Sequence, residues 1–173
     1  MSDDNESNLF VNDNFTISFW YYADDDMPNF SSAMSSRNVP ETGNDGGNFS
    51  WQLDSTGGKL RWRSAAGDAN SGTVHTVASS SYPTQQWSHA SFVKYDNGTS
   101  MIYMNGVLEV TSSESQPTPM TMLKIGTNRR NELPWKGYLD EFKIYKRALN
   151  STDVCNLFKN DGPLNNSPAV TCP

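Results

Sequence analysis

Residues 87–111 read WSHASFVKYDNGTSMIYMNGVLEVT, three apolar stretches separated by two turns. The turns contain the pairs Asn97-Gly98 and Asn105-Gly106, and such pairs adopt the positive φ angles that tight hairpin turns require. The segment is therefore predicted to form a three-stranded antiparallel meander, with strands at 87–95, 100–104 and 107–111.

A second central strand is predicted upstream, at residues 15–22 (FTISFWYY). Its apolar residues alternate along the chain, which places Phe15, Ile17, Phe19 and Tyr21 on one face. Residues 24–48 follow, rich in Ser, Asn and Gly, and they are predicted to form one long loop.

Five further short strands are expected, at 49–53, 59–63, 73–78, 122–125 and 137–145. Residues 55–58 form the turn between the first two. In the last strand Leu139 is out of phase with Phe142 and Ile144, so a β-bulge is predicted at Asp140-Glu141.

The sequence favours one short C-terminal helix. Ser151 can cap it, and the apolar residues Val154, Leu157 and Phe158 follow at helical spacing. Many short strands and a single helix predict an all-β fold, an antiparallel sandwich of two sheets.

The order of these motifs resembles the laminin G-like, concanavalin A-like jelly-roll family. The resemblance covers residues 9–160, preceded by a flexible acidic lead-in at 1–8 and followed by a tail at 161–173. It implies a two-sheet jelly roll that binds glycans or proteins outside the cell, commonly with a calcium site. The residues that carry it are FTISFW (15–20), FSWQLDSTGGKLRW (49–62), WSHASFVKYDNG (87–98), MIYMNGVLE (101–109), LKIGTN (123–128) and GYLDEFKIYKRALNSTDVCNLF (137–158).

One departure concerns the N-terminus. Family members usually begin with a further apolar strand, and here only Leu9, Phe10 and Val11 could supply it. Either the domain is trimmed or a neighbouring chain donates the missing strand to the open sheet edge.

Charge and hydropathy exclude some classes of partner. The net charge of −6 argues against nucleic acid, whose phosphates require a concentrated basic surface. No apolar stretch reaches the roughly 20 residues that span a bilayer, so membrane insertion is not expected, and no signal peptide follows Met1. If the protein is secreted, its signal peptide is missing from this sequence.

Two observations favour an extracellular location. Cys155 and Cys172 both lie near the C-terminus, where a disulfide would hold the tail and contribute about 3 kcal/mol; the alternative is two free thiols. N-glycosylation sequons are also numerous, although in a bacterial or phage protein they would mean nothing. They lie at Asn5, Asn14, Asn29, Asn48, Asn97, Asn150 and Asn165, of which Asn14 adjoins the first core strand.

Catalytic residues are not evident, and the protein is predicted not to be an enzyme. Glycosidases of this fold carry a tight Glu-x-Asp-x-x-Glu cluster, which is absent here. His89 lies in a strand where a structural role is expected, His75 is isolated, and neither cysteine has zinc-site or nucleophile spacing.

A calcium site is the remaining cofactor prediction, together with N-linked glycans. Asp140, at the predicted bulge, resembles the family position that often meets the ion, and Asp24, Asp25 and Asp26 could complete the site. The alternative is a solvated acidic turn.

Aromatic residues are the candidates for sugar binding. Trp135 is the most suggestive because it lies in a loop between Pro134 and Lys136, although a packed loop anchor is the alternative. Trp62 and Tyr82 are the further candidates, with Trp51 beside them.

The sequence thus predicts a non-catalytic extracellular module that binds glycan or protein, as part of a larger glycoprotein. The alternative is a glycosylated structural subunit of an extracellular filament, sheath or appendage, which self-assembles with a strand from a neighbour.

Overall fold

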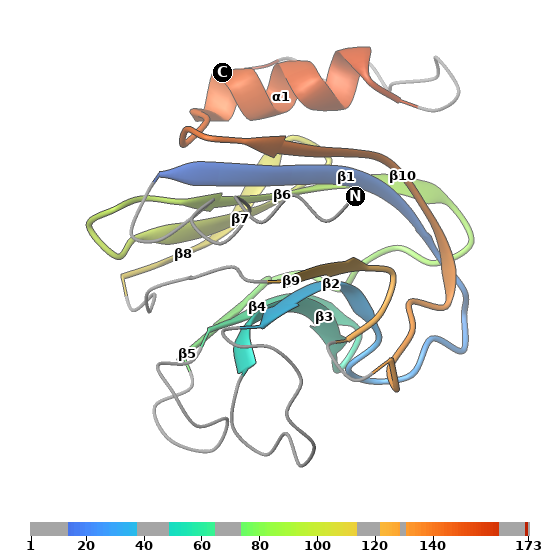
Figure 1. The fold of residues 1–173 in the computed structure, drawn as a ribbon. Coiled ribbons are helices and arrows are strands. Elements are labelled where there is room, and N and C mark those ends of the chain that lie inside the picture. The colour runs from blue at the N-terminus through green and yellow to red at the C-terminus, as the bar shows by residue number, and fades with distance from the viewer. Residues whose placement is uncertain are drawn as a thin grey trace, which may run out of the picture.

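The computed structural model contains two facing antiparallel sheets (Figure 1). It describes residues 14–37, 49–64, 74–113, 122–128, 131–162 and 172, and within these residues each sheet has five strands. Sheet I has the order β10 (Gly137–Tyr145), β1 (Phe15–Ala23), β6 (Trp87–Lys94), β7 (Ser100–Met104) and β8 (Val107–Ser112). Sheet II has the order β5 (Val74–Val77), β4 (Lys59–Ser64), β3 (Phe49–Thr56), β2 (Ser32–Arg37) and β9 (Met122–Ile125).

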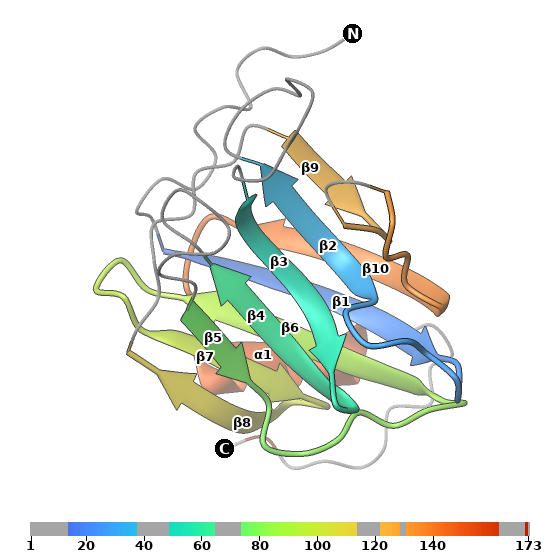
Figure 2. The same cartoon turned by 90° about the horizontal axis from the view of Figure 1, so that it is seen from below.

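The helix α1 (Ser151–Asn160) lies on the outer face of sheet I, the face turned away from sheet II. Figure 1 therefore shows three layers, and Figure 2 shows the strands of sheet II side by side in front. The predicted all-β sandwich with a single C-terminal helix is confirmed for the described part of the chain.

The predicted meander is confirmed as β6, β7 and β8. Asn105 and Gly106 have φ angles of 48° and 77°, as the tight turn requires. The bulge in β10 is confirmed as well: Ser18 pairs with Lys143 but Trp20 pairs with Asp140, so β10 has one extra residue there, and Glu141 has a φ of 48°.

The prediction of one loop over residues 24–48 is wrong for 32–37, which form β2 between β3 and β9. The strand is rich in serine, which hides its β character in the sequence. The hydroxyls of Ser32 and Ser35 are buried and donate to backbone carbonyls, to Leu53 O at 3.3 Å and to Thr127 O at 3.1 Å respectively. Residues 38–48 lie outside the described residues.

The core between the sheets is centred on Trp62 of β4, whose side chain is fully buried. Its ring stacks on that of Phe92 of β6 with centroids 3.6 Å apart and an interplanar angle of 11°. Phe15 of β1 tilts against both rings, at 6.0 Å and 5.9 Å. Aromatic contacts thus join the two sheets directly.

The N-cap of α1 is Asn150 rather than the predicted Ser151, because Asn150 Oδ1 accepts the Asp153 N–H at 2.8 Å. On its inner face Phe158 stacks on Trp20 of β1 at 5.5 Å. The predicted disulfide between Cys155 and Cys172 is present and ties the tail to α1. Most of the tail, 163–171 and 173, and the lead-in 1–8 lie outside the described residues.

His89 of β6 is buried beneath α1, where its Nε2 lies 2.8 Å from Ser18 Oγ. Burial lowers the pKa of His89 to about 4, with Asp161 opposing and Lys143 adding to this shift. The ring is therefore neutral at pH 7, in agreement with the structural role expected from the sequence.

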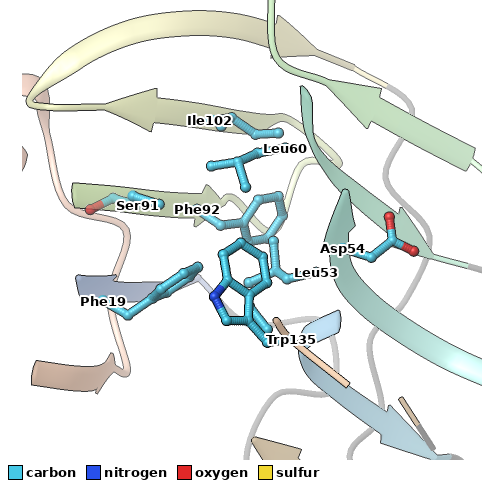
Figure 3. Close-up of a pocket in the computed structure, with 10 residues that line it drawn as sticks. Phe19, Leu53, Asp54, Leu60, Ser91, Phe92, Ile102 and Trp135 are labelled. Carbon is cyan, nitrogen blue, oxygen red and sulfur yellow. The ribbon is translucent and has the colours of Figure 1, made fainter. Parts of the chain in front are cut away.

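A charged network is buried in sheet II. Arg61 donates from Nε to Asp54 Oδ1 at 2.7 Å and from Nη2 to Asp54 Oδ2 at 2.8 Å, and Gln52 donates to Oδ2 at 2.7 Å. Arg63 lies 3.9 Å from the same carboxylate, and the Phe30 ring lies 5.0 Å from the Arg61 guanidinium. In Figure 3 the Asp54 carboxylate turns away from the core side chains, so the network lies on the outer face of sheet II.

We expect His89 to lower the stability of the protein in weak acid. An unfolded histidine titrates near pH 6.5 and the folded one near 4, so the unfolded chain alone takes up the proton between these values. The free energy of unfolding should fall by about 3 kcal/mol from pH 6.5 to pH 4 relative to the His89→Gln variant. Urea titrations of both proteins across this range measure the difference, and parallel curves would contradict the assignment.

Asp54→Asn should destabilise the fold strongly, because it leaves Arg61 and Arg63 without their shared carboxylate. The expected loss is about 3–5 kcal/mol of unfolding free energy. Asp153→Asn, which breaks a partly exposed ion pair with Arg147, is the matched control and should cost less than about 1 kcal/mol. Equal losses in urea unfolding would contradict this reading of the network.

Candidate functional site

Three aromatic side chains meet on the outer face of sheet I, beyond the part that α1 covers. Tyr22 of β1 pairs in register with Tyr138 of β10 on one side and with Trp87 of β6 on the other. Ring centroids lie 5.8 Å apart for Tyr22 and Tyr138, 6.0 Å for Tyr22 and Trp87, and 6.4 Å for Trp87 and Tyr138. We call Tyr22, Trp87 and Tyr138 the aromatic triad.

The triad forms a partly exposed aromatic patch. Trp87 and Tyr138 belong to strands on opposite sides of β1, about 9.6 Å apart at the backbone, yet their rings approach to 6.4 Å. The two rings therefore close over Tyr22, which is half-buried, while Tyr138 has an exposed fraction of 66%. A patch of this kind offers ring faces and edges on which a flat, partly apolar ligand can stack.

A glycine sets the position of Tyr138. Gly137 has a φ of 128°, and a Cβ atom at this residue would lie 2.0 Å from the Tyr22 carbonyl oxygen. Only glycine therefore lets β10 approach β1 closely enough at this end for Tyr138 to reach the triad.

A polar rim adjoins the triad. Gln85 has a φ of 53°, and two hydrogen bonds hold it: its N–H donates to Ala23 O at 2.9 Å, and its Oε1 accepts from the Tyr22 hydroxyl at 2.9 Å. A positive φ is uncommon outside glycine and is found more often at functional sites. Because the amide oxygen faces Tyr22, the NH₂ group is the part of Gln85 that can donate to a ligand.

The predicted calcium residues Asp24, Asp25 and Asp26 follow β1 directly and belong to this rim. Thr84 donates to Asp25 Oδ1 at 2.5 Å, and Asp26 forms an ion pair with Lys136, which lowers the pKa of Asp26. The fourth predicted ligand, Asp140, lies on β10 opposite Trp20, and its Oδ1 accepts the Glu141 N–H at 2.8 Å.

Within the described ranges, no three Asp, Glu, His or Cys side chains gather where they could hold one metal ion. Asp25, Asp26 and Asp140 each already accept a hydrogen bond within the protein. The described residues do not form a ready set of calcium ligands. The calcium site stays a prediction.

The aromatic residues predicted to bind sugar lie inside the molecule instead. Trp62 packs between the sheets, and Tyr82 is buried with its N–H donating to Gly58 O at 2.9 Å. Trp135 is buried as well: its Nε1 donates to Tyr22 O at 3.3 Å, and its ring meets Tyr21 edge-on at 5.6 Å. All three have packing roles, because burial leaves them no ring face for a ligand. The side chain of Trp51 lies outside the described residues.

A small cavity lies between the sheets beside Trp135. Figure 3 shows Trp135 converging with Phe19, Phe92 and Leu53 around it. The cavity encloses about 10 Å³, far below the size of a ligand pocket. It is a packing gap in the core.

A wider groove of about 230 Å³ lies between α1 and the chain that leads into it. Its charged side chains are bound to neighbours: Asp153 accepts from Arg147 at 2.8 Å and Asp161 from Lys143 at 2.8 Å. The groove is open and holds one aromatic residue, Tyr145, so it is a weaker candidate than the triad.

The described strands contain no pair of facing carboxylates suited to glycoside hydrolysis. In sheet II, Asp54 is the only acidic residue within the strands as the structure bounds them, and Arg61 occupies both its oxygens. In sheet I, Glu109 of β8 accepts the Ser80 N–H at 2.8 Å, four strands away from Asp140 and Glu141 of β10. The side chain of His75 lies outside the described residues.

Four of the sequons can be placed. Asn29, Asn97 and Asn150 are exposed, whereas Asn14 is half-buried and both of its amide atoms bond to Asp96, at 3.1 Å and 3.3 Å. Asn5, Asn48 and Asn165 lie outside the described residues. No helix among the described residues is long and apolar enough to span a bilayer.

The sequence does not predict the triad, although it places Tyr22, Trp87 and Tyr138 in predicted strands. A signal was present, because the alternation that buries Tyr21 places Tyr22 on the opposite face. The pairing of Tyr22 with residues 65 and 116 positions further along the chain could not be read from that alternation.

Comparisons with known proteins agree on the fold. A family model described as "Concanavalin A-like lectin/glucanases superfamily" matches residues 3–155. No curated protein matches the chain.

Several solved structures are similar in fold. Domain 4 of AbnA, a GH43 extracellular arabinanase from Geobacillus stearothermophilus, in complex with arabinotriose, is 21% identical with a TM-score of 0.64; the match covers 86% of this chain and 67% of that one. The receptor binding domain of botulinum neurotoxin type G is 19% identical with a TM-score of 0.62, over 85% of this chain and 38% of that one. The binding domain of Paraclostridial Mosquitocidal Protein 1 is 22% identical with a TM-score of 0.59, over 87% and 38%. At these identities the likeness shows the fold, and this chain spans well under half of the two toxin domains.

In a eukaryotic secretory host we expect glycans on the exposed Asn29, Asn97 and Asn150, and little or none on Asn14. Asn97→Gln should lower the intact mass by the mass of one N-glycan, while Asn14→Gln should leave the number of attached glycans unchanged. Mass spectrometry before and after enzymatic deglycosylation distinguishes these outcomes. Full occupancy at Asn14 with an empty Asn97 would contradict the ranking by exposure.

Proposed function

Because this chain belongs to the concanavalin A-like lectin/glucanases superfamily, we propose that it is a non-catalytic extracellular binding domain whose aromatic triad stacks on a sugar ring of a glycan. The single observation that carries this proposal is the triad itself. One exposed and two half-buried rings clustered on a sheet face are uncommon without a ligand or partner, and a pyranose presents the flat C–H face that stacks on such rings.

Polar groups beside the triad fit the same ligand. Gln85 can donate to a sugar hydroxyl from its NH₂ group, and Asp140, two residues after Tyr138 on the same face of β10, can accept from one. Apolar stacking with a few placed donors and acceptors is the usual composition of a small-molecule site. The described residues therefore supply both the stacking rings and the polar groups of a sugar subsite.

We propose no catalytic role for the triad, since the described strands offer no facing carboxylate pair there. Asp140 and Glu141 are neighbours on one strand, β10. Their carboxylates therefore do not face each other across a bound ligand, as the pair in a glycosidase does.

The comparisons support a binding role outside the cell. One similar domain was solved with arabinotriose, and others are receptor-binding domains of toxins. The disulfide between Cys155 and Cys172 is of the kind that persists in oxidising compartments. Glycan is the ligand that the triad favours over protein, because the patch is small and polar groups surround it closely.

A structural subunit is the second candidate function. Its support is the edge strand β8, on which Val107 and Leu108 are both exposed and whose outer backbone groups could pair with another chain. Residues 9–11, which bear on strand donation, lie outside the described residues.

Removing one ring of the triad should abolish most of the affinity. A glycan array identifies a ligand, and isothermal titration calorimetry then compares variants. Tyr138→Ala and Trp87→Ala should each weaken binding about tenfold or more, while Tyr138→Phe, which keeps the ring, should bind nearly as the parent does.

Leu108→Ala is the matched control, because it removes an exposed apolar side chain from the opposite edge of sheet I. It should leave glycan binding unchanged. A protein that binds no glycan, or whose affinity survives the loss of both rings, would refute the proposal, and self-association abolished by Leu108→Ala would favour the second candidate.

A further inference from the structure

Four aspartates lie close along the chain to residues of the aromatic triad. Asp24, Asp25 and Asp26 follow Tyr22 within two to four residues, so the backbone of Asp24 lies within about 7 Å of the backbone of Tyr22. Asp140 lies two residues beyond Tyr138 on the same face of β10, again about 7 Å away. Asp25, Asp26 and Asp140 are exposed.

The cations described near the triad do not balance these carboxylates. Lys136 forms its ion pair with Asp26. Lys143 lies further along β10 and forms ion pairs with Glu141 at 3.1 Å and with Asp161 at 2.8 Å. Its positive charge is therefore already paired with two other carboxylates. Beyond these ion pairs, Asp24, Asp25 and Asp140 add three carboxylates to this end of sheet I.

We infer that the aromatic triad selects uncharged glycans and rejects those that carry a sulfate or a carboxylate on or next to the stacked sugar. This inference rests on the proposed function, since it assigns the ligand class of the same site. Its basis is the juxtaposition of the stacking rings with the carboxylates of Asp24, Asp25 and Asp140.

The expected selectivity follows from simple electrostatics. A unit negative charge about 8 Å from three carboxylates in water is disfavoured roughly tenfold without screening and about threefold at physiological ionic strength. The rejection should therefore weaken as salt is added. Stacking on the rings involves no charge and should be nearly independent of salt.

The test compares two oligosaccharides that differ by one sulfate group, with calorimetry at about 20 mM and about 500 mM salt. The parent protein should bind the neutral oligosaccharide three- to tenfold more tightly at low salt, and the ratio should approach one at high salt.

The double variant Asp25→Asn/Asp140→Asn should reduce the ratio at low salt by about half or more. An asparagine Oδ1 can still accept from Thr84 or from the Glu141 N–H, so both substitutions remove charge and keep the hydrogen bonds. Asp153→Asn is the control for net charge: its carboxylate accepts from Arg147, which lies two residues beyond Tyr145 at the end of β10 opposite to Tyr138. It should leave the ratio unchanged.

The possible failures are distinguishable. If the neutral oligosaccharide binds and Tyr138→Ala abolishes binding, but the sulfated form binds equally well or better, the proposed function stands and this inference falls. A preference that the double variant does not change also overturns the inference. If neither oligosaccharide nor any other glycan binds, the proposed function fails and the inference fails with it.

Discussion

The stack of Trp62 on Phe92 is the contact on which the rest of the molecule depends. It joins a strand of sheet II to a strand of sheet I at 3.6 Å and fixes which face of each strand turns inward. Since side chains alternate along a strand, Phe92 facing inward requires His89 and Trp87 of the same strand to face outward. Tyr21 facing inward likewise requires Tyr22 to face outward. The core therefore dictates the outer face of sheet I.

The length of α1 decides which part of that outer face stays open. Ten helical residues span about 15 Å, whereas the nine residues of β1 span about 30 Å, so the helix covers about half of the strand. The covered half includes Trp20 and His89, which pack against Phe158. The uncovered half includes Tyr22. A structural element and a candidate binding surface thus share one sheet face because the helix is shorter than the strands beneath it.

How far the sequence could predict this depends on whether the signal was local. The meander, the hairpin of β3 and β4 and the bulge at Glu141 come from turn residues and from a break in alternation, which are contained in short stretches. The strand β2 was missed because buried serines look like loop residues until their backbone acceptors are known. The triad was missed for a different reason, since it requires the registers of three strands from distant parts of the chain. For Trp135 the sequence left sugar binding and a packed anchor both open, because a loop position says nothing about whether a ring turns inward, and the structure places the ring in the core.

Carboxylates serve two physically different purposes in this fold, and the difference separates affinity from selectivity. Asp54 is buried, so it must be paired, and its bonds to Arg61 and Gln52 hold the sheet rather than a ligand. Asp25 and Asp140 are exposed, so water solvates them and their influence on a ligand is a screened field. Such a field can disfavour an anion but cannot hold a neutral sugar. The affinity of the site must then come from the rings of the triad and from short hydrogen bonds such as those available to Gln85 and Asp140, while the negative charge of the carboxylates determines which glycans are excluded.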